Sequence, residues 1–345
     1  MQHGSGIQIA GTGSFVPEHI VPTRVIGDLV ERYAPGKGAV WATEKLGVFE
    51  RHFALPLDQA TGYPIGETDE LVLAEHAARR AIQRAGIDAR ALDGLWYVSC
   101  TQSEAHRHFG RLALGLHDRL GLRSDTFAIE MDAGCGGAVH AIAGAAAQMR
   151  GAELDYIMVA ASNMPSQYFR AWESYARSGA WLSMYLFGDG AGAIVLGRSR
   201  RQNDGILAAY TAVDPSNPLM QFGCAGEQNT PVYRIDGRGV ALGFRSYARA
   251  ALAELQLRYA FRLEDVSRFY FHQVNAVVLR GFVAELGIPD DRVAVHVDRY
   301  GNLASAATLV LLDEDLRSGA VLLGDLCVVC AVGAGAQYGA ILVQL

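Results

Sequence analysis

Long apolar runs and amphipathic stretches alternate along the first half of the chain. The runs Ile7–Phe15, 94–100 and 154–162 contain few polar residues, which is typical of buried parallel strands. Residues 69–85 and 109–120 place apolar side chains at helical spacing, so two helices are expected between these strands. This alternation of strand and helix predicts the α/β fold class.

A further helix is expected over residues 138–150, directly after Cys135. The segment is rich in alanine and poor in bulky or charged side chains. A helix without a polar face is normally surrounded by protein, so this helix should lie in the centre of the fold.

The second half of the chain repeats this plan. A long helix, a strand and two shorter helices are expected, followed by two terminal strands. Their predicted ranges are 243–259, 268–272, 276–285, 304–316, 325–330 and 339–344.

The two halves are alike around two candidate functional residues. In each half a helix that begins with small residues follows a glycine-flanked position, Cys135 in one case and Asn302 in the other. We therefore expect an architecture of two duplicated halves, residues 1–200 and 201–345. The seam should lie in the polar stretch at 199–205.

Composition and charge exclude several classes of function. The chain has 345 residues, half of them hydrophobic, and a net charge of -6 without a run of Lys or Arg. Nucleic acid is therefore not expected as a partner. The first residues do not resemble a secretory signal, and the uncharged run 326–345 is interrupted by glycine and glutamine. We expect a cytoplasmic protein without a membrane span.

Cysteine and metal patterns are weak. Five irregularly spaced cysteines do not indicate a disulfide framework, and we expect Cys327 and Cys330 to be buried strand residues despite their CxxC spacing. The sequence has none of the usual metal-binding motifs, so we expect no metal site.

Cys135 is the candidate nucleophile. It stands at the predicted start of a helix, where free N–H groups and the helix dipole lower the pKa of a thiol. The flanking Gly134, Gly136 and Gly137 would allow a tight turn and leave N–H groups free to stabilise an oxyanion. A buried structural cysteine explains this segment alone equally well.

His272 and Asn302 are the other two candidates. His272 should emerge at the carboxyl end of an apolar strand, where α/β sheets build their sites. Asn302 lies between Gly301 and a small-residue helix. Considered separately, a structural histidine and a helix-capping asparagine are the more common explanations.

Two glycine-rich segments do not support nucleotide binding. The segment that begins at Gly11 lacks the third glycine of a dinucleotide fingerprint, and Pro17 interrupts the expected helix. Residues 187–193, Phe-Gly-Asp-Gly-Ala-Gly-Ala, lack the Lys-Ser/Thr of a P-loop. We expect this segment to turn into a buried strand, with Asp189 bonded to local backbone.

Taken in order, these motifs resemble the ketoacyl synthase III branch of the thiolase superfamily along the whole chain. The resemblance rests on Gly-Thr-Gly-Ser-Phe-Val-Pro, Cys135 before a Gly/Ala helix, Phe-Gly-Asp-Gly-Ala-Gly-Ala, His272-Gln-x-Asn and Tyr-Gly-Asn302. It implies a thiolase-like five-layered αβαβα fold and a homodimer. It also implies a catalytic triad in which a thioester acylates Cys135, while His272 and Asn302 stabilise the enolate from a malonyl thioester.

The resemblance assigns further site residues. The backbone N–H groups of Cys135 and Ala334 would form an oxyanion hole, and Phe109 would reach across the dimer into the acyl pocket of the neighbour. Trp41, Lys45 and Asn275 would bind coenzyme A. Three departures stand out: the carrier-docking positions are apolar at Leu242, Val277 and Ala284, Lys45 replaces an arginine, and residues 164–184 form a longer segment rich in aromatics. That segment is either a dimer contact or a reshaped acyl pocket.

The function predicted from the sequence is that of a ketoacyl synthase III-like condensing enzyme. It would act by decarboxylative Claisen condensation, in polyketide or other secondary metabolism related to fatty acid biosynthesis. Its substrates would be thioesters of coenzyme A or of an acyl carrier protein, with no permanently bound cofactor. A ketosynthase-like acyltransferase is the alternative, and a silent partner subunit of a related synthase is a third possibility.

Overall fold

The computed structural model describes residues 6–58, 60–101, 111–199, 204–217, 220–225 and 230–345. Its larger sheet belongs to the first half of the chain and has the strand order β1-β7-β6-β4-β5. The parallel pairs are β4 with β5 and β4 with β6, whereas β7 runs antiparallel to both β6 and β1. The strands are β1 (Ile7–Phe15), β4 (Gly94–Ser99), β5 (Phe127–Met131), β6 (Tyr156–Asn163) and β7 (Gly190–Arg198).

The second sheet repeats this pattern of directions. Its order is β11-β12-β13-β8, with β11 parallel to β12 and antiparallel pairing between β12 and β13 and between β13 and β8. The same sequence of directions runs through β4, β6, β7 and β1 of the first sheet. The strands are β8 (Gly205–Val213), β11 (Arg268–Phe271), β12 (Leu326–Val332) and β13 (Gln337–Gln344).

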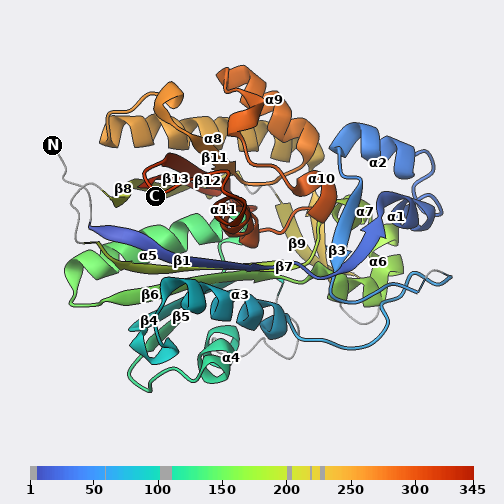
Figure 1. Ribbon diagram of the computed structural model, residues 1–345. Coiled ribbons are helices and arrows are strands. Elements are labelled where there is room, and N and C mark those ends of the chain that lie inside the picture. The colour runs from blue at the N-terminus through green and yellow to red at the C-terminus, as the bar shows by residue number, and fades with distance from the viewer. Residues whose placement is uncertain (1–5, 59, 102–110, 200–203, 218–219, 226–229) are drawn as a thin grey trace.

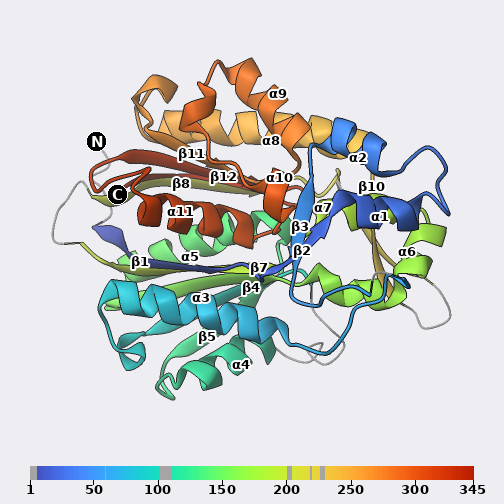
Figure 2. The same cartoon turned by 45° about the vertical axis from the view of Figure 1, so that its right-hand side comes forward.

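Helices complete five layers (Figures 1 and 2). Two helices cover the outer face of the first sheet, two lie between the sheets, and two cover the outer face of the second sheet. In that order they are α3 (Glu70–Ala85) with α4 (Arg111–Leu120), α5 (Gly137–Gly151) with α11 (Ala306–Ser318), and α8 (Gly237–Arg258) with α9 (Ala276–Leu286). The αβαβα prediction is confirmed, whereas the division at residue 200 stays a prediction.

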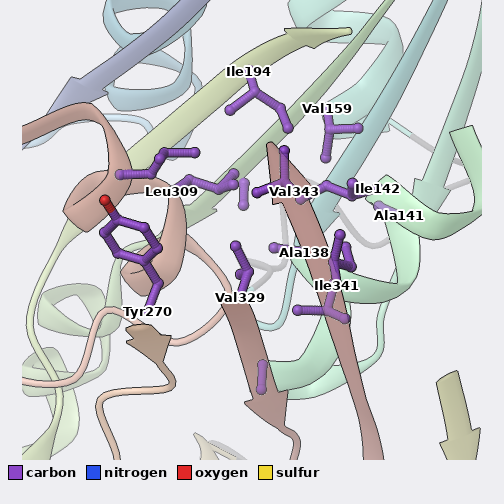
Figure 3. Packing of buried hydrophobic residues seen from close by; sticks show 14 of the residues in the cluster. Ala138, Ala141, Ile142, Val159, Ile194, Tyr270, Leu309, Val329, Ile341 and Val343 are labelled. Carbon is purple, nitrogen blue, oxygen red and sulfur yellow. The ribbon is translucent and has the colours of Figure 1, made fainter. Parts of the chain in front are cut away.

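The middle layer consists of the two small-residue helices that the sequence indicates. Ala138, Ala141 and Ile142 of α5 pack with Leu309 of α11 between the two sheets (Figure 3). Short side chains allow both sheets to approach these helices closely. The amino ends of α5 and α11 are therefore fixed near each other, and the Ser305 hydroxyl donates a 2.8 Å hydrogen bond to the Gly134 carbonyl.

A cap of short elements covers one end of the layers, with its own buried cluster. It contains most of the aromatic segment 164–184 and packs α1, α2 and α7 together. The elements of this region are β2 (His19–Pro22), α1 (Thr23–Val30), α2 (Ala39–Leu46), β3 (Glu50–Phe53), η4 (Pro165–Ala171), α6 (Trp172–Arg177), α7 (Trp181–Leu186), β9 (Met220–Ala225), β10 (Thr230–Ile235) and α10 (Val297–Tyr300).

Most predicted elements are found within a few residues of their expected bounds. The clearest difference is α8, which begins at Gly237, six residues before the expected start, because the Asp236 side chain caps it by accepting from Arg238 N–H. The expectation that Asp189 bonds local backbone is wrong. Its carboxylate accepts from Ala54 and Ser166 N–H groups, which joins distant segments. Among the described residues, no helix has the length and hydropathy needed to cross a membrane.

Candidate active site

Cys135 lies in a tight turn between β5 and α5. The turn η3 (Gly134–Gly136) leads directly into α5, as the glycine pattern predicts. Gly134 has a φ of +51°, and a Cβ atom there would lie 3.0 Å from the backbone nitrogen of Ala334. Glycine is required at this position for both its backbone conformation and its close contact with the 333–335 loop.

The thiol of Cys135 is more basic than the sequence suggests. Burial, followed by the negative charge of Asp132, raises the pKa of Cys135 to about 12. The Cys135 N–H and the Asn302 side chain act in the opposite direction but do not outweigh burial. The expectation of a lowered pKa is therefore wrong, and the side chain of Cys135 is a thiol at neutral pH.

His272 directly follows β11 and is buried. Its N–H donates a 2.8 Å hydrogen bond to the Cys330 carbonyl, which continues the pairing of β11 with β12. Burial and the neighbouring His296 lower the pKa of His272 to about 3, so the imidazole is neutral at physiological pH.

Asn302 is held by backbone and side-chain hydrogen bonds. Its N–H donates to Leu186 O at 2.7 Å, and its side-chain Oδ1 accepts from Ala304 N–H at 2.8 Å. The second bond fixes the orientation of the amide, so that Nδ2 lies 3.4 Å from Nε2 of His272. Gly301 supports this turn, because its φ is +75° and a Cβ there would lie 3.0 Å from Leu186 O.

One cavity of about 50 Å³ brings the three candidates together. Cys135, His272 and Asn302 line it with Ala334, and most of the other lining side chains are apolar. The thiol thus shares an apolar cavity with a neutral imidazole and a fixed amide. Such surroundings strengthen hydrogen bonds to a developing negative charge.

The Ala334 N–H is available to a ligand. Ala334 lines this cavity beside the turn that carries Cys135, and its N–H has no hydrogen-bond partner among the described residues. A free backbone donor beside a nucleophile is what an oxyanion hole requires.

A second, smaller cavity of about 20 Å³ lies in the aromatic segment. Phe187 lines both cavities, so the two spaces meet the same side chain. The remaining lining residues come from 165–184 and are mostly aromatic, namely Pro165, Tyr168, Phe169, Trp172, Tyr175, Ser183 and Met184.

The predicted coenzyme A residues lie near α2 and α9. Trp41 contacts Trp181 edge to face at a centroid distance of 5.4 Å, and the ammonium of Lys37 lies 4.8 Å from its ring centroid. Lys45 is exposed on the last turn of α2, and the Asn275 side chain caps α9 by accepting from Val278 N–H. Phe109 lies outside the described residues.

Sequence reasoning missed several neighbours of the site. His296 lies beside His272, and Trp181 and Lys37 contact Trp41, but none carried a recognisable pattern. The only available signal was the tryptophan content of 164–184, which did not identify the partner of Trp41.

Comparison with known families supports the assignment of the chain. Residues 129–215 match the family model of 3-oxoacyl-[acyl-carrier-protein (ACP)] synthase III, and residues 258–345 match the model of its C-terminal part. The two matches cover just over half of the chain and include Cys135, His272 and Asn302. The chain belongs to the 3-oxoacyl-ACP synthase III family.

Relatives of this synthase III chain match it over nearly its full length. The beta-ketoacyl-ACP synthase III of Acidiphilium cryptum is 26% identical over 340 residues, covering 97% of this chain and 98% of the relative. That of Alkalilimnicola ehrlichii is 29% identical over 348 residues, covering 98% of both. The chain is thus a synthase III-like acyltransferase of the condensing type, a family that uses acyl thioesters.

Solved synthase III structures share the fold. The 3-oxoacyl-ACP synthase III of Aquifex aeolicus superimposes with a TM-score of 0.81 at 24% identity, over 98% of this chain and all of that chain. The priming beta-ketosynthase of the R1128 polyketide biosynthetic pathway gives the same TM-score and identity, over 98% of this chain and 96% of that chain.

Proposed function

We propose that this protein joins an acyl group to a malonyl thioester by decarboxylative Claisen condensation, with Cys135 as the residue that carries the acyl group. The fixed amide of Asn302 is the observation that carries the proposal, since its Nδ2 faces the cavity of Cys135 and lies 3.4 Å from His272 Nε2. Acyl transfer alone needs a nucleophile and a base. A second fixed donor is useful when an enolate must be stabilised.

Acylation is the first half-reaction. Sγ of Cys135 attacks the carbonyl carbon of an acyl thioester, the bond to the donor sulfur breaks, and the proton from Sγ leaves with the departing thiol. The N–H groups of Ala334 and Cys135 would stabilise the negative oxygen of the tetrahedral intermediate. Because burial raises the pKa of the thiol, its proton must be lost as the new bond forms.

Decarboxylation and condensation form the second half-reaction. The malonyl thioester loses carbon dioxide, and the electron pair of the broken C–C bond gives an enolate. Its oxygen would accept hydrogen bonds from Asn302 Nδ2–H and from neutral His272 Nε2–H. The enolate carbon then attacks the acyl carbonyl, and the Cys135 thiolate leaves and takes one proton from solvent.

The aromatic segment supports a role in choosing the acyl group. Phe187 lines both its cavity and the cavity of Cys135, and Trp172 and Tyr175 in its lining are nearly fully buried. We propose that the acyl chain on Cys135 extends past Phe187 into this space. The cavity is small and closed by rigid rings, so short acyl groups should be favoured over long ones.

Coenzyme A and an acyl carrier protein are the proposed donors of the thioesters. Trp41, Lys45 and Asn275 are proposed to contact coenzyme A, with Trp181 as an additional aromatic surface beside Trp41. The contacts that Trp41 already makes with Trp181 and Lys37 would have to open for a nucleobase to stack on it.

The surface that would meet a carrier protein is partly apolar. Leu242 on α8 and Val277 on α9 are 60% and 46% exposed. Leu242 lies one turn before Arg245 and Val277 one turn before Gly281, where a Cβ would lie 2.7 Å from the Arg245 guanidinium. The nearby Arg245 and Arg249 both pair with Glu285, so one of their two positive charges is compensated. A carrier would therefore gain less from charge attraction here than on a basic surface.

A homodimer and a place in secondary metabolism complete the proposal. Phe109 would complete the acyl pocket of the neighbouring subunit. The similarity to a priming ketosynthase of a polyketide pathway supports a role in polyketide or related biosynthesis.

The alternative is acyl transfer from Cys135 to an alcohol, an amine or a carrier thiol, with His272 as general base. The apolar character of Leu242 and Val277 favours this alternative, since an acceptor other than an acidic carrier would suit such a surface. Both functions begin with the same acyl-enzyme.

The test is to incubate the pure protein with a panel of acyl-CoA thioesters and a malonyl thioester. Intact mass reports acylation of Cys135, and labelled carbon dioxide and the ketoacyl product report condensation. The Cys135→Ala variant is the control and should not be acylated. If Cys135 is acylated but no carbon dioxide is released, and the acyl group is passed to an added nucleophile, the protein is an acyltransferase and the proposed condensation is wrong.

A further inference from the structure

Arg51 lies on β3 at a position where an apolar side chain would be expected. The residues of β3 alternate between half-buried and buried, and Arg51 points to the same face as Phe53, two residues further on. Both side chains are fully buried. Burial lowers the pKa of Arg51 to about 9, so its guanidinium stays charged at neutral pH. A positive charge is therefore held inside the cap.

The hydrogen bonds that Arg51 makes with the described residues go to uncharged oxygen atoms. Its Nη1 donates to Val21 O at 3.0 Å, and its Nη2 donates to Thr23 Oγ1 at 3.0 Å and to Tyr185 O at 2.8 Å. Its Nε is buried and has no partner among these residues. Burying a charge without an opposite charge beside it is costly, so stability alone does not explain an arginine here.

One of these bonds holds the segment that pairs with Asn302. Tyr185 directly precedes Leu186, whose carbonyl accepts the Asn302 N–H at 2.7 Å. Gly188 N–H donates in return to the Asn302 carbonyl at 3.2 Å. The bond from Arg51 to Tyr185 O therefore lies one residue before the carbonyl that holds Asn302.

The stem of Arg51 packs against the same pairing. A Cβ at Gly301 would lie 3.0 Å from the Cβ of Arg51, and a Cβ at Gly188 would lie 3.3 Å from it. Gly301 directly precedes Asn302, so both paired backbones approach Arg51 closely. The stem and the guanidinium of Arg51 thus contact the two segments whose pairing sets the position of Asn302.

We propose that Arg51 is a positioning residue that holds segment 185–188 against Asn302 and thereby sets where the Asn302 amide meets the enolate. This proposal rests on the proposed function, because the enolate forms only in the decarboxylation step. A planar guanidinium can direct N–H groups to Val21 O and Tyr185 O at once, which a single ammonium does less well. A misplacement of about 1 Å at the reacting groups can slow a reaction by about 10²-fold.

Two substitutions of Arg51 and one control separate this role from general stabilisation. Arg51→Met keeps an unbranched apolar stem and loses every donor. Arg51→Lys keeps the charge but has one nitrogen to serve both carbonyls. Thr23→Val is the matched control. It removes one acceptor of the same guanidinium and the 2.6 Å bond from Thr23 Oγ1 to Val48 O, but it leaves the bond to Tyr185 O.

The first experiment measures the two half-reactions separately in the full-length protein. Intact mass reports acylation of Cys135, and labelled malonyl thioester reports release of carbon dioxide. In Arg51→Met we expect carbon dioxide release to slow about 10–100-fold and acylation to stay within about threefold of the wild type. Arg51→Lys should show a smaller loss in the same step. Partial unfolding would slow both steps equally, so the ratio of the two rates reports the positioning role.

The second experiment is residue-resolved hydrogen exchange, which does not depend on turnover. The N–H groups of Asn302 and Gly188 should exchange about tenfold faster in Arg51→Met, because their pairing is loosened. The N–H of His272, which is bonded to Cys330 O, is the internal reference and should not change. In Thr23→Val all three N–H groups should exchange within about twofold of the wild type.

The proposal is overturned if Arg51→Met slows both half-reactions equally, or if the N–H groups of Asn302 and His272 exchange faster to the same extent. It also fails if Thr23→Val changes the ratio of the two rates as much as Arg51→Met does. Where Arg51→Met does not fold, Arg51→Lys decides by the same criteria, and if neither variant folds, Arg51 has a structural role only. If exchange changes as expected but the wild type releases no carbon dioxide, the proposed function fails and the positioning role of Arg51 stands.

Discussion

The amide nitrogen of Asn302 lies 3.4 Å from Nε2 of His272, and the hydrogen bond from Ala304 N–H to Oδ1 determines which end of the amide faces the imidazole. Nδ2 must therefore be the atom directed into the cavity, and a ligand oxygen placed there can accept from both side chains. Asn302 should therefore matter for the second half-reaction and not for acylation, because only the second half-reaction forms an enolate.

Replacement of Asn302 should affect the second half-reaction alone. In Asn302→Ala we expect acylation of Cys135 to stay within about threefold of the wild type. Carbon dioxide release should fall by about 10²–10³, the usual cost of losing one donor to an oxyanion. Stopped-flow mass analysis and labelled malonyl thioester measure the two steps separately. Equal losses in both steps would contradict the assigned role.

Gly134 should be needed for the oxyanion hole. Alanine at this position would adopt a φ of +51° and place its Cβ 3.0 Å from the Ala334 nitrogen. We expect Gly134→Ala to slow acylation by about 10–100-fold, because the Ala334 N–H would be displaced. Gly151→Ala is the matched control, since Gly151 ends α5 with open space around it. Acylation by both variants at the wild-type rate would argue against this oxyanion hole.

The two buried histidines should make the fold sensitive to acid. Burial lowers the pKa of His272 and of His296 to about 3, whereas unfolded histidines titrate near 6.5. As pH falls from 6.5 towards 3, the unfolded state gains protons that the folded state does not. Each histidine then lowers the free energy of unfolding by about 1.4 kcal/mol per pH unit.

The His296→Gln variant isolates this effect. Burial raises the pKa of Asp189 to about 7, which opposes the histidines over part of the range but is present in both proteins. Urea unfolding between pH 7 and 4.5 should show a smaller loss of stability in the variant, by about 1.4 kcal/mol per pH unit. Parallel curves for the two proteins would mean that His296 is not a neutral buried group.

Met184 should limit the size of the acyl group. It is buried and lines the aromatic cavity, so Met184→Ala should enlarge that space. We expect kcat/KM for a longer or branched acyl thioester, relative to a short one, to rise about tenfold. Met149→Ala, a buried position on α5 away from this cavity, controls for the expected loss of about 2–5 kcal/mol in stability. If Met184→Ala had the same acyl preference as the wild type, the aromatic cavity would not be the space that selects the acyl group.

Charges placed on the apolar surface should improve use of an acidic carrier protein. Leu242→Lys combined with Val277→Lys should raise kcat/KM with a malonyl carrier protein about tenfold at low salt, and the gain should disappear at high salt. The reaction with malonyl-CoA should not change. Leu257→Lys, an 81% exposed position near the far end of α8, is the control. If Leu257→Lys raised kcat/KM with the carrier protein as much as the double variant does, the carrier would have to bind elsewhere.

The fold could be predicted because its central elements carry strong local patterns. The apolar runs of β1, β4 and β6 and the small-residue helices α5 and α11 define the middle of the structure, and the resemblance to a known family supplied the number of layers. The cap could not be predicted in this way. Its strands β2 and β3 have four residues each, which is too short for a hydrophobic period to stand out.

The candidate site could be predicted only in part. The glycines beside Cys135 and Asn302 and the polar residues after His272 drew attention to these positions. The pKa of the thiol depends on burial and on Asp132, and the segments that carry His272 and His296 are brought together by the parallel bridge between Phe269 and Val293. Neither relationship leaves a local trace in the sequence.

The central claim is that acyl-Cys135 is consumed by decarboxylative condensation. The most direct measurement is to acylate the protein, remove excess donor, and add malonyl thioester labelled with ¹³C in its free carboxylate. We predict that labelled carbon dioxide appears at the same rate as the Cys135 adduct disappears and the ketoacyl product forms. Loss of the adduct without labelled carbon dioxide, or a Cys135 that no thioester acylates, would contradict the account.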